Sequence, residues 1–305
     1  MAKEAQDLKY ILITPARNEG AFLEETIRSV AGQTLLPERW VIVSDGSTDR
    51  TDEIIQDHAA RHTWIRYVRR PTHAERHFAA KACAFSAGYA SVETILHDVV
   101  GNLDADLSFG PDTMQFLMSR FAEDQGLGVA GVPFVELSGE AYDYRFTNIE
   151  HVSGACQLFR RECFKAIGGY KPMEGGGIDW LAVTTARMMG WKTRTFPERS
   201  VLHHRKIGTG QSNRLRALYR QGAKDFTLGN HPLWQLFRAL YQMRNRPLGI
   251  GGLAILTGYI WSFLRGVPRT APPEIVRFCR NEQMARLRAA LKIGRSGRAI
   301  QGPPP

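Results

Sequence analysis

The sequence predicts an α/β protein with a mixed, mainly parallel sheet flanked by helices, followed by a helical and basic C-terminal extension. In the first half of the chain, short apolar runs alternate with amphipathic helical patterns, which is typical of βαβ units. The composition is that of a globular protein, with 43% hydrophobic and 23% charged residues in a chain of 305, and it argues against a disordered or collagen-like protein. A sharp change in charge near residue 200 separates the extension from the rest.

Local patterns predict the individual elements. Four β-rich apolar runs, each bounded by turn residues, are predicted strands: 9–14, 40–44, 65–68 and 99–104. Apolar residues at helical spacing predict helices over 21–31 and 51–61, and polar residues of the sequence DGSTD are candidates to cap the second. The mixed pattern that follows contains the strand-like runs LGVAGVPFVEL, CQLFR, WKTRTF and SVLHHR, a glycine-rich loop at 175–177 and a helix over 178–189.

The charge pattern indicates a division near residue 200. Residues 1–200 hold 22 Lys and Arg against 27 Asp and Glu, a balance of −5, whereas residues 201–305 hold 18 against 3, a balance of +15. A basic extension favours an anionic partner, either a phosphate-rich membrane surface or a nucleic acid. Because its arginines alternate with Leu, Ile and Trp, we favour an anionic membrane surface and expect no specific nucleic acid partner.

The segment 247–264 has 18 residues without a charge and is flanked by arginines. A bilayer core about 30 Å thick needs about 20 apolar residues, and this segment contains four glycines. A helix lying in one leaflet therefore fits better than a span, and a buried core helix is the alternative. The four cysteines form no CxxC pair and the N-terminus is polar, so we expect reduced thiols, no signal peptide and a cytoplasmic location.

Two carboxylates, Asp104 and Asp106, lie at the end of the strand predicted at 99–104. Residues i and i+2 of an extended segment point the same way, and two converging carboxylates are costly to place together unless a cation compensates. Hard oxygen ligands of this kind suit Mg²⁺ or Mn²⁺. The DxD pattern alone is weak, because surface turns use it freely.

Other polar residues follow predicted strands whose carboxyl ends a parallel sheet would bring to one edge. Glu19 lies in TPARNEG after the first strand, and Asp45 opens DGSTD after the second, where it could bind a base or ribose or belong to an ordinary helix start. Asp179 follows three glycines and is either an exposed cap or a base in a mobile loop. His203 and His204 would face opposite ways in a strand, so at most one would point into a site.

The order of these motifs resembles that of the family 2 glycosyltransferases, which have the GT-A fold and transfer sugars from nucleoside diphosphates with inversion, usually with Mg²⁺ or Mn²⁺. The resemblance covers about residues 9–205 and rests on six segments in the same order: ILITPARNEG, VIVSDGSTD, HFAAKACAFSAGYA, NLDAD, CQLFRRECFKAIGGY and GGGIDW. It implies a GT-A domain over 1–210, and we expect residues 211–305 to form a helical, membrane-associating region.

The resemblance also implies a role for each matching residue on the donor side. Pro15, Ala16 and Glu19 would hold the nucleoside, and Asp45 would read the edge of the base. Lys81 matches a basic position near the base and the diphosphate.

On the reaction side, Asp104 would contact the ribose and the donor, and Asp106 would ligate a metal that stabilises the leaving diphosphate. Asp179 matches the general base that removes the proton of the acceptor hydroxyl. We assign His204 to the metal as a further ligand. The loop around it would contact phosphate or acceptor through His203, Arg205 and Lys206.

These expectations combine into an inverting glycosyltransferase that uses a nucleotide-diphosphate sugar, UDP-sugars being favoured, and a lipid-linked or saccharide acceptor in envelope or exopolysaccharide assembly. We expect it to be peripheral or monotopic on the cytoplasmic face of the inner membrane. The sequence QSNRL resembles the Gln-x-x-Arg-Trp motif of processive synthases but has Leu215 in place of Trp, which favours single additions. The alternatives are a non-catalytic GT-A scaffold and a nucleic-acid or membrane-binding module that uses the basic region.

Overall fold

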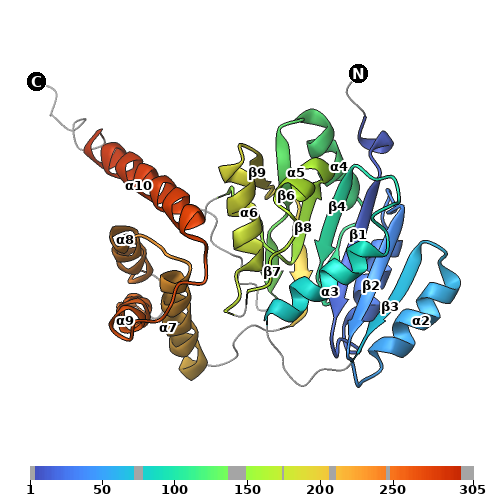
Figure 1. Ribbon diagram of the computed structural model, residues 1–305, viewed down its shortest axis with the longest axis horizontal. Coiled ribbons are helices and arrows are strands. Elements are labelled where there is room, and N and C mark those ends of the chain that lie inside the picture. The colour runs from blue at the N-terminus through green and yellow to red at the C-terminus, as the bar shows by residue number, and fades with distance from the viewer. Residues whose placement is uncertain are drawn as a thin grey trace, which may run out of the picture. The chain divides into compact units, whose positions relative to one another are not determined.

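The structure is a computed structural model, and it describes residues 4–71, 78–136, 149–173, 175–205, 211–244 and 248–296. The chain divides into two compact units, residues 1–207 and 208–305 (Figure 1). This boundary lies between residue 200, where the charge changes, and residue 210, where the GT-A domain is expected to end. The first unit contains all the described strands, and the described elements of the second are helices.

A seven-stranded sheet forms the centre of the first unit, and four of its strands are parallel neighbours. Across the sheet these are β3 (Ile65–Arg70), β2 (Arg39–Asp45), β1 (Tyr10–Ala16) and β4 (Val99–Leu103). The sheet continues with β8 (Cys156–Arg160), which is antiparallel to both neighbours, and then with β6 (Leu127–Gly131) and β9 (Lys192–Thr195). The mainly parallel sheet and the four strands predicted in the first half of the chain are confirmed.

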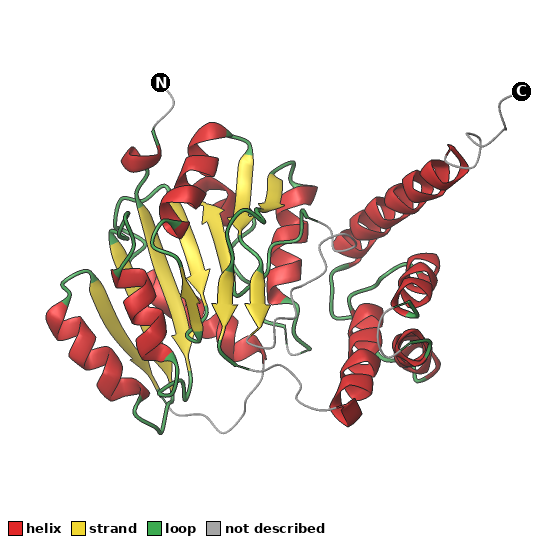
Figure 2. Ribbon diagram, turned by 180° about the vertical axis from the view of Figure 1, so that it is seen from behind, coloured by secondary structure: helices red, strands yellow, loops and turns green. Residues whose placement is uncertain are grey.

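Helices cover both faces of this sheet, as the views from the front and from behind show (Figures 1 and 2). The helices expected over 21–31, 51–61 and 178–189 are present with slightly different ends. The α-helices of the unit are α1 (Leu23–Ala31), α2 (Thr51–Arg61), α3 (Phe78–Ala90), α4 (Thr113–Glu123), α5 (Arg161–Ala166) and α6 (Ile178–Met188).

Alternation along the strands divides the buried side chains between the two faces. Leu12 and Ile42 belong to the main core, which also contains the apolar side chains of α1 and α4. Ile13 and Val43 lie against α3, where a Cβ on Gly88 would come within 2.8 Å of each of them. Glycine at this position therefore lets α3 lie directly on the sheet.

A second sheet of three strands brings the end of the unit back to the middle of the chain. Strand β10 (Val201–His203) lies between β5 (Leu107–Phe109), which is antiparallel to it, and β7 (Phe134–Glu136), which is parallel. In this pairing His203 is opposite Leu107. The run LGVAGVPFVEL is thus divided between two strands of different sheets, β6 and β7, with Pro133 between them, a residue that cannot donate to a ladder.

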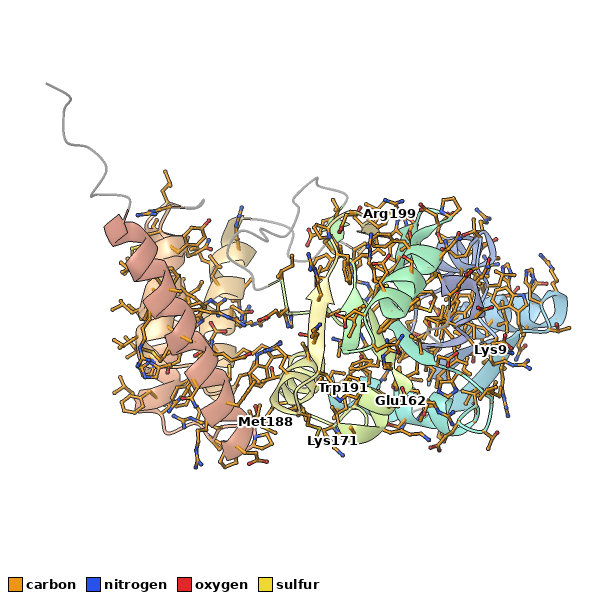
Figure 3. The ribbon with its side chains drawn as sticks, turned by 90° about the horizontal axis from the view of Figure 1, so that it is seen from above. Lys9, Glu162, Lys171, Met188, Trp191 and Arg199 are labelled. Atoms are coloured by element: carbon orange, nitrogen blue, oxygen red, sulfur yellow. The ribbon has the colours of Figure 1, made fainter. Side chains whose placement is uncertain are left out.

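A surface ion pair lies just before β10. The guanidinium of Arg199, labelled in Figure 3, makes a bidentate contact with the carboxylate of Asp112 at the start of α4, with an Nη2–Oδ2 distance of 2.6 Å. The contact ties the segment that enters β10 to the loop that follows β5. The pairing of these two short strands is therefore supported from outside the ladder.

The second unit contains four described helices, and glycines set how closely two of them approach. A Cβ on Gly258 would lie 2.0 Å from the carbonyl oxygen of Tyr219, and one on Gly222 would lie 1.9 Å from that of Ile255. None of the described helices is long and apolar enough to cross a bilayer. The helices are α7 (Gln211–Thr227), α8 (Pro232–Gln242), α9 (Ile250–Leu264) and α10 (Pro273–Ser296).

Candidate active site

The carboxyl ends of β2, β1 and β4 lie side by side, and the predicted donor residues lie at this edge. Pro15 and Ala16 end β1, Asp45 ends β2, and Asp104 directly follows β4. In open α/β sheets, ligands bind outside the carboxyl ends of the strands. The structure therefore brings together residues that are up to 89 positions apart in the sequence, from Pro15 to Asp104, as parallel pairing of the strands predicts.

The loops that follow β1 and β2 are joined by hydrogen bonds. Asn18 has a left-handed backbone with φ 55°, which asparagine tolerates better than most residues. Its Oδ1 accepts a hydrogen bond from the N–H of Thr48 at 2.8 Å. Asp49 accepts from the N–H groups of Gly20, at 3.0 Å, and Thr51, at 3.0 Å, so it supports both the first loop and the start of α2. Thr48, a candidate cap of α2, instead fixes the neighbouring loop.

Asp45 is buried and paired with an arginine that the sequence patterns did not single out. The Oδ1 of Asp45 lies 2.5 Å from Nη1 of Arg70 on the neighbouring strand β3, at the register position directly opposite. A basic residue at the end of an adjacent parallel strand was the signal that could have identified this partner. The pair orients a buried carboxylate at the edge of the sheet.

Asp104 is part of a compact polar group with Lys81 and Asn102. The ammonium of Lys81 lies 2.5 Å from Oδ1 of Asp104 and 3.3 Å from the carbonyl oxygen of Gly154. The amide of Asn102 donates to the same carbonyl at 2.5 Å. Burial lowers the pKa of Lys81, but the nearby carboxylates of Asp104, Asp179 and Asp106 outweigh it, and the net pKa is raised. The lysine is therefore held as a cation.

Asp104, Asp106 and His203 form a cluster that could hold a metal ion. One potential ligand atom from each lies within 4.8 Å of the others, and Asp106 and His203 are buried. Burial raises the pKa of Asp106, and the neighbouring carboxylate of Asp104 raises it further, while His203, Arg205 and Lys81 oppose the shift. A cation between two such carboxylates would relieve this repulsion.

The orientation of His203 also fits a metal ligand. Its Nδ1 lies 2.8 Å from the carbonyl oxygen of Arg205, and because a carbonyl only accepts, the proton is on Nδ1. The Nε2 atom, 3.5 Å from Oδ1 of Asp106, is therefore the ring nitrogen that is left to bind a metal. A second hydrogen bond that fixes the tautomer is typical of metal-binding histidines. Two carboxylates and one imidazole therefore form a donor set that fits a divalent ion.

His204, which the sequence analysis assigned to the metal, lies elsewhere. Its Nε2 is 2.9 Å from Oγ of Ser108, and its ring stacks on Phe22. Adjacent residues at a strand end point to opposite sides, so only one of the two histidines can face the carboxylates. The structure places His203 there, and this corrects the choice between them. Lys206 lies outside the described residues.

Arg205 connects the first loop to the carboxylate cluster. Its guanidinium pairs with Glu19 through Nη2 and lies 3.3 Å from Oδ2 of Asp106 through Nε. Burial raises the pKa of Glu19 to about 7, and the charges of Asp106 and Asp104 add to this, while Arg205 opposes it. A single guanidinium thus links the loops after β1 and β10.

Asp179 lies near the start of α6, after Gly177, whose backbone is left-handed with φ 96°. Its Oδ2 accepts from the N–H of Gly154 at 3.2 Å. A Cβ on Gly154 would lie 3.0 Å from Cβ of Asp179, so glycine permits this close approach. Gly154 therefore contacts Asp179 through its N–H and Lys81 through its carbonyl. The sequence patterns did not identify this glycine, although a glycine just before a buried strand was a signal of close backbone approach.

The fold and the cluster define a class of protein in which two carboxylates that could hold a metal lie at the carboxyl edge of a mainly parallel α/β sheet. The chain belongs to glycosyl transferase family 2, since that family matches residues 11–168, about half of the chain. It is 28% identical over 133 residues to the uncharacterized glycosyltransferase EpsJ of Bacillus subtilis, a match over 44% of this chain and 36% of EpsJ. It is also 28% identical over 113 residues to the chondroitin synthase of Escherichia coli, covering 37% of this chain and 15% of the synthase. The chain thus spans about a third or less of these relatives.

Solved structures with the same fold are GT-A glycosyltransferases. The mannosyltransferase PcManGT from Pyrobaculum calidifontis, solved with GDP-Man and Mn²⁺, has a TM-score of 0.55 at 18% identity, and the match covers 98% of this chain and 82% of that one. S. aureus TarS 1-349 in complex with UDP-GlcNAc has a TM-score of 0.53 at 14% identity, with 86% and 74% covered. These likenesses confirm the GT-A fold that the sequence predicts.

Proposed function

We propose that this family 2 glycosyltransferase transfers a sugar from a nucleoside diphosphate, with UDP favoured, to an acceptor hydroxyl and inverts the anomeric centre. The observation that carries the proposal is the convergence of Asp104, Asp106 and His203 beside the paired Asp45 at one edge of the sheet. It is the arrangement expected of a site that must hold a metal, a diphosphate and a nucleoside together.

The nucleoside occupies the loops at the ends of β1 and β2 in this proposal. Pro15, Ala16 and Glu19 form one wall, and the Asp45 carboxylate accepts hydrogen bonds from the N–H groups of the base. Its contact with Arg70 holds that carboxylate in place before the donor arrives, so little ordering remains to be done on binding. The hydrogen bonds between the loops that follow β1 and β2 support this proposal, because Asn18 and Asp49 fix these two loops relative to each other.

The carboxylates of Asp104 and Asp106 and the Nε2 of His203 hold a divalent ion, either Mg²⁺ or Mn²⁺. The nitrogen ligand favours a transition metal, and hence Mn²⁺, over Mg²⁺. Such an ion supplies Lewis-acid stabilisation of the charge that develops on the leaving diphosphate. Arg205, which already contacts Asp106 and Glu19, is placed to exchange one of these contacts for a phosphate oxygen.

Asp179 acts as the general base. Its carboxylate removes the proton of the acceptor hydroxyl as that oxygen attacks the anomeric carbon from the face opposite the diphosphate, and the attack inverts the centre. The N–H of Gly154 orients this carboxylate at 3.2 Å. Lys81 lies close enough to both Asp104 and Asp179 for their charges to raise its pKa, which supports placing the base and the donor carboxylate in one site.

The helical unit docks on the anionic cytoplasmic face of the inner membrane, and the acceptor is a lipid-linked saccharide in envelope or exopolysaccharide assembly. Exposed apolar side chains and a strongly basic composition in this unit support the docking. The side chains belong to α8, α9 and the turns beside them: Leu233, Leu236, Leu240, Leu248, Ile250, Leu253, Ile260, Trp261, Phe263, Leu264 and Val267.

Binding of a nucleotide panel tests the donor assignment. UDP, GDP, dTDP and CMP are compared by thermal shift, each with and without Mn²⁺. We expect UDP to stabilise the protein only when Mn²⁺ is present, by about 2.7 kcal/mol at a hundredfold excess over its dissociation constant. Preference for GDP would correct the nucleotide and keep the site, whereas the absence of any metal-dependent stabilisation would refute the proposed donor site.

A further inference from the structure

A pocket of about 570 Å³ lies within the helical unit, and the described residues that line it all belong to that unit. It is formed by the start of α8, the first half of α10 and the turn between α9 and α10. Its size is in the range of small-molecule sites. Basic and apolar side chains share the lining, which includes His231, Arg269, Arg277, Arg280, Val276 and Met284.

The arginines of this pocket have no acidic partner in the part of the chain that the structure describes. Arg280 donates from Nε to the carbonyl oxygen of Gly229 at 2.8 Å. The guanidinium of Arg269 lies 5.9 Å from the centre of the Phe226 ring. Three guanidinium groups around one pocket repel each other, and an anionic ligand would relieve this repulsion. Phosphate suits them best, because arginine binds phosphate oxygens in a bidentate manner.

His231 adds a neutral donor to the same pocket. Its Nδ1 accepts from the N–H of Leu233 at 3.2 Å, so the neutral ring carries its proton on Nε2. Its backbone N–H donates to Oε1 of Gln283 at 2.8 Å, which ties the start of α8 to α10. The ring is therefore held in one orientation before any ligand binds.

Exposed apolar side chains lie directly beside this basic pocket. On one side Leu233, two residues after His231, has 51% of its surface exposed. On the other side, the Phe226 ring that Arg269 covers also contacts the ring of Phe263, which is 65% exposed. A ligand in the pocket would thus have its anionic group among arginines and apolar surface next to it.

We propose that this pocket binds the phosphate head group of an anionic membrane lipid. The arginines take the phosphate oxygens, Val276 and Met284 contact the glycerol part, and the acyl chains extend into the bilayer in which the neighbouring exposed side chains are embedded. The inference rests on the proposed membrane docking and adds to it a preference for particular lipids. It explains why cations and apolar side chains occur together here, a combination that a nucleic acid would not require.

Vesicle sedimentation tests this site. Arg269→Gln/Arg277→Gln is compared with Arg216→Gln/Arg288→Gln, which removes the same charge from exposed arginines of this unit that do not line the pocket. With vesicles of phosphatidylcholine and phosphatidylglycerol, we expect the pocket variant to bind about tenfold more weakly than the control variant. With phosphatidylcholine alone, the two variants should bind equally. Arg269→Lys/Arg277→Lys keeps the charges and should retain most of the binding, which separates loss of the site from loss of the fold.

Each other outcome overturns the proposal. Equal losses in the two glutamine variants would mean that charge acts diffusely over the unit. If soluble glycerol phosphate, at the same concentration as the lipid, competes with the vesicles, the pocket binds free phosphate esters. If a short DNA duplex displaces the wild-type protein from the vesicles but does not displace the pocket variant, the pocket binds nucleic acid. If the wild type does not bind vesicles, both the lipid site and the membrane docking are refuted. Metal-dependent UDP binding, measured on the same preparations, reports separately on the donor site.

Discussion

The two units of this protein differ in how their charged side chains are paired and in how much apolar surface they expose. At the carboxyl edge of the sheet, acidic side chains are largely buried and paired with cations, as Asp45 is with Arg70 and Asp104 with Lys81. In the helical unit, the three arginines that line the pocket beside α10 have no acidic partner among the residues that the structure describes. Of the exposed large apolar side chains that the structure describes, eleven belong to the helical unit and four to the sheet unit.

This difference suits the two units to different functions, catalysis in the sheet unit and attachment to a surface in the helical unit. A preorganised set of paired charges suits chemistry, because the groups are already placed where charge will develop. The exposed apolar side chains of the helical unit and the arginines of its pocket suit attachment to an apolar and anionic surface. We therefore expect changes in one unit to affect one activity and to spare the other.

The largest effect is expected in the sheet unit, from Asp179→Asn. The amide has the same shape but cannot accept a proton, so turnover should fall by about 10²–10⁴-fold, the usual contribution of a general base. Metal-dependent UDP binding should be unchanged. Turnover and UDP affinity are measured beside Asp124→Asn, which removes a surface carboxylate paired with Lys192. Full activity of Asp179→Asn would exclude it as the base.

A smaller effect in the same unit distinguishes the two adjacent histidines. His203→Ala should weaken Mn²⁺ binding by at least about 10–100-fold, the loss typical of removing a residue that supports a metal site. His204→Ala should leave it nearly unchanged, because that ring contacts Ser108 and Phe22. Calorimetry in the presence of UDP measures both affinities, with unfolding temperatures as the control. If His204→Ala shows the greater loss, the metal is not bound at His203.

The smallest expected effect concerns the helical unit. Leu253→Glu/Phe263→Glu puts charges on the exposed face of α9 and should weaken vesicle binding by about tenfold or more, since burying one large apolar side chain is worth about 1.5–3 kcal/mol. Leu36→Glu/Leu96→Glu makes the same change at exposed positions of the sheet unit and should have little effect. Equal behaviour of the two variants in vesicle sedimentation would contradict docking through α9. Neither should alter UDP binding.

The positions of site residues at strand ends could be predicted from the sequence. The residues with which they pair in the folded structure could not. Asp45, Asp104 and Asp106 follow runs of β-rich apolar residues, so their common edge follows from parallel pairing alone. The choice between His203 and His204 depends on the pairing of β10 with β5, a strand of three residues that has no local pattern. The arginine partner of Asp45 depends on the register of β2 and β3. Both depend on contacts between distant segments.

The uncharged segment 247–264 illustrates the same limit. Its length and composition suit an interfacial helix or a buried one, and the local pattern does not choose between them. In the structure α9 has both characters: Gly258 approaches the backbone of α7, while Leu253 and Phe263 are more than half exposed. The position of the glycines relative to a neighbouring helix decides which face is covered, and that neighbour is not visible in the segment itself.

Binding of Mn²⁺ tests most directly whether the two carboxylates and His203 form a metal site. The ion is titrated into the protein with UDP present, and the electron paramagnetic resonance signal of free Mn²⁺ is followed for wild type, Asp106→Asn and the surface control Asp124→Asn. Wild type and Asp124→Asn should bind a single ion with the same affinity, and Asp106→Asn should lose it. If Asp106→Asn binds Mn²⁺ as tightly as wild type, the metal site is not at this edge of the sheet.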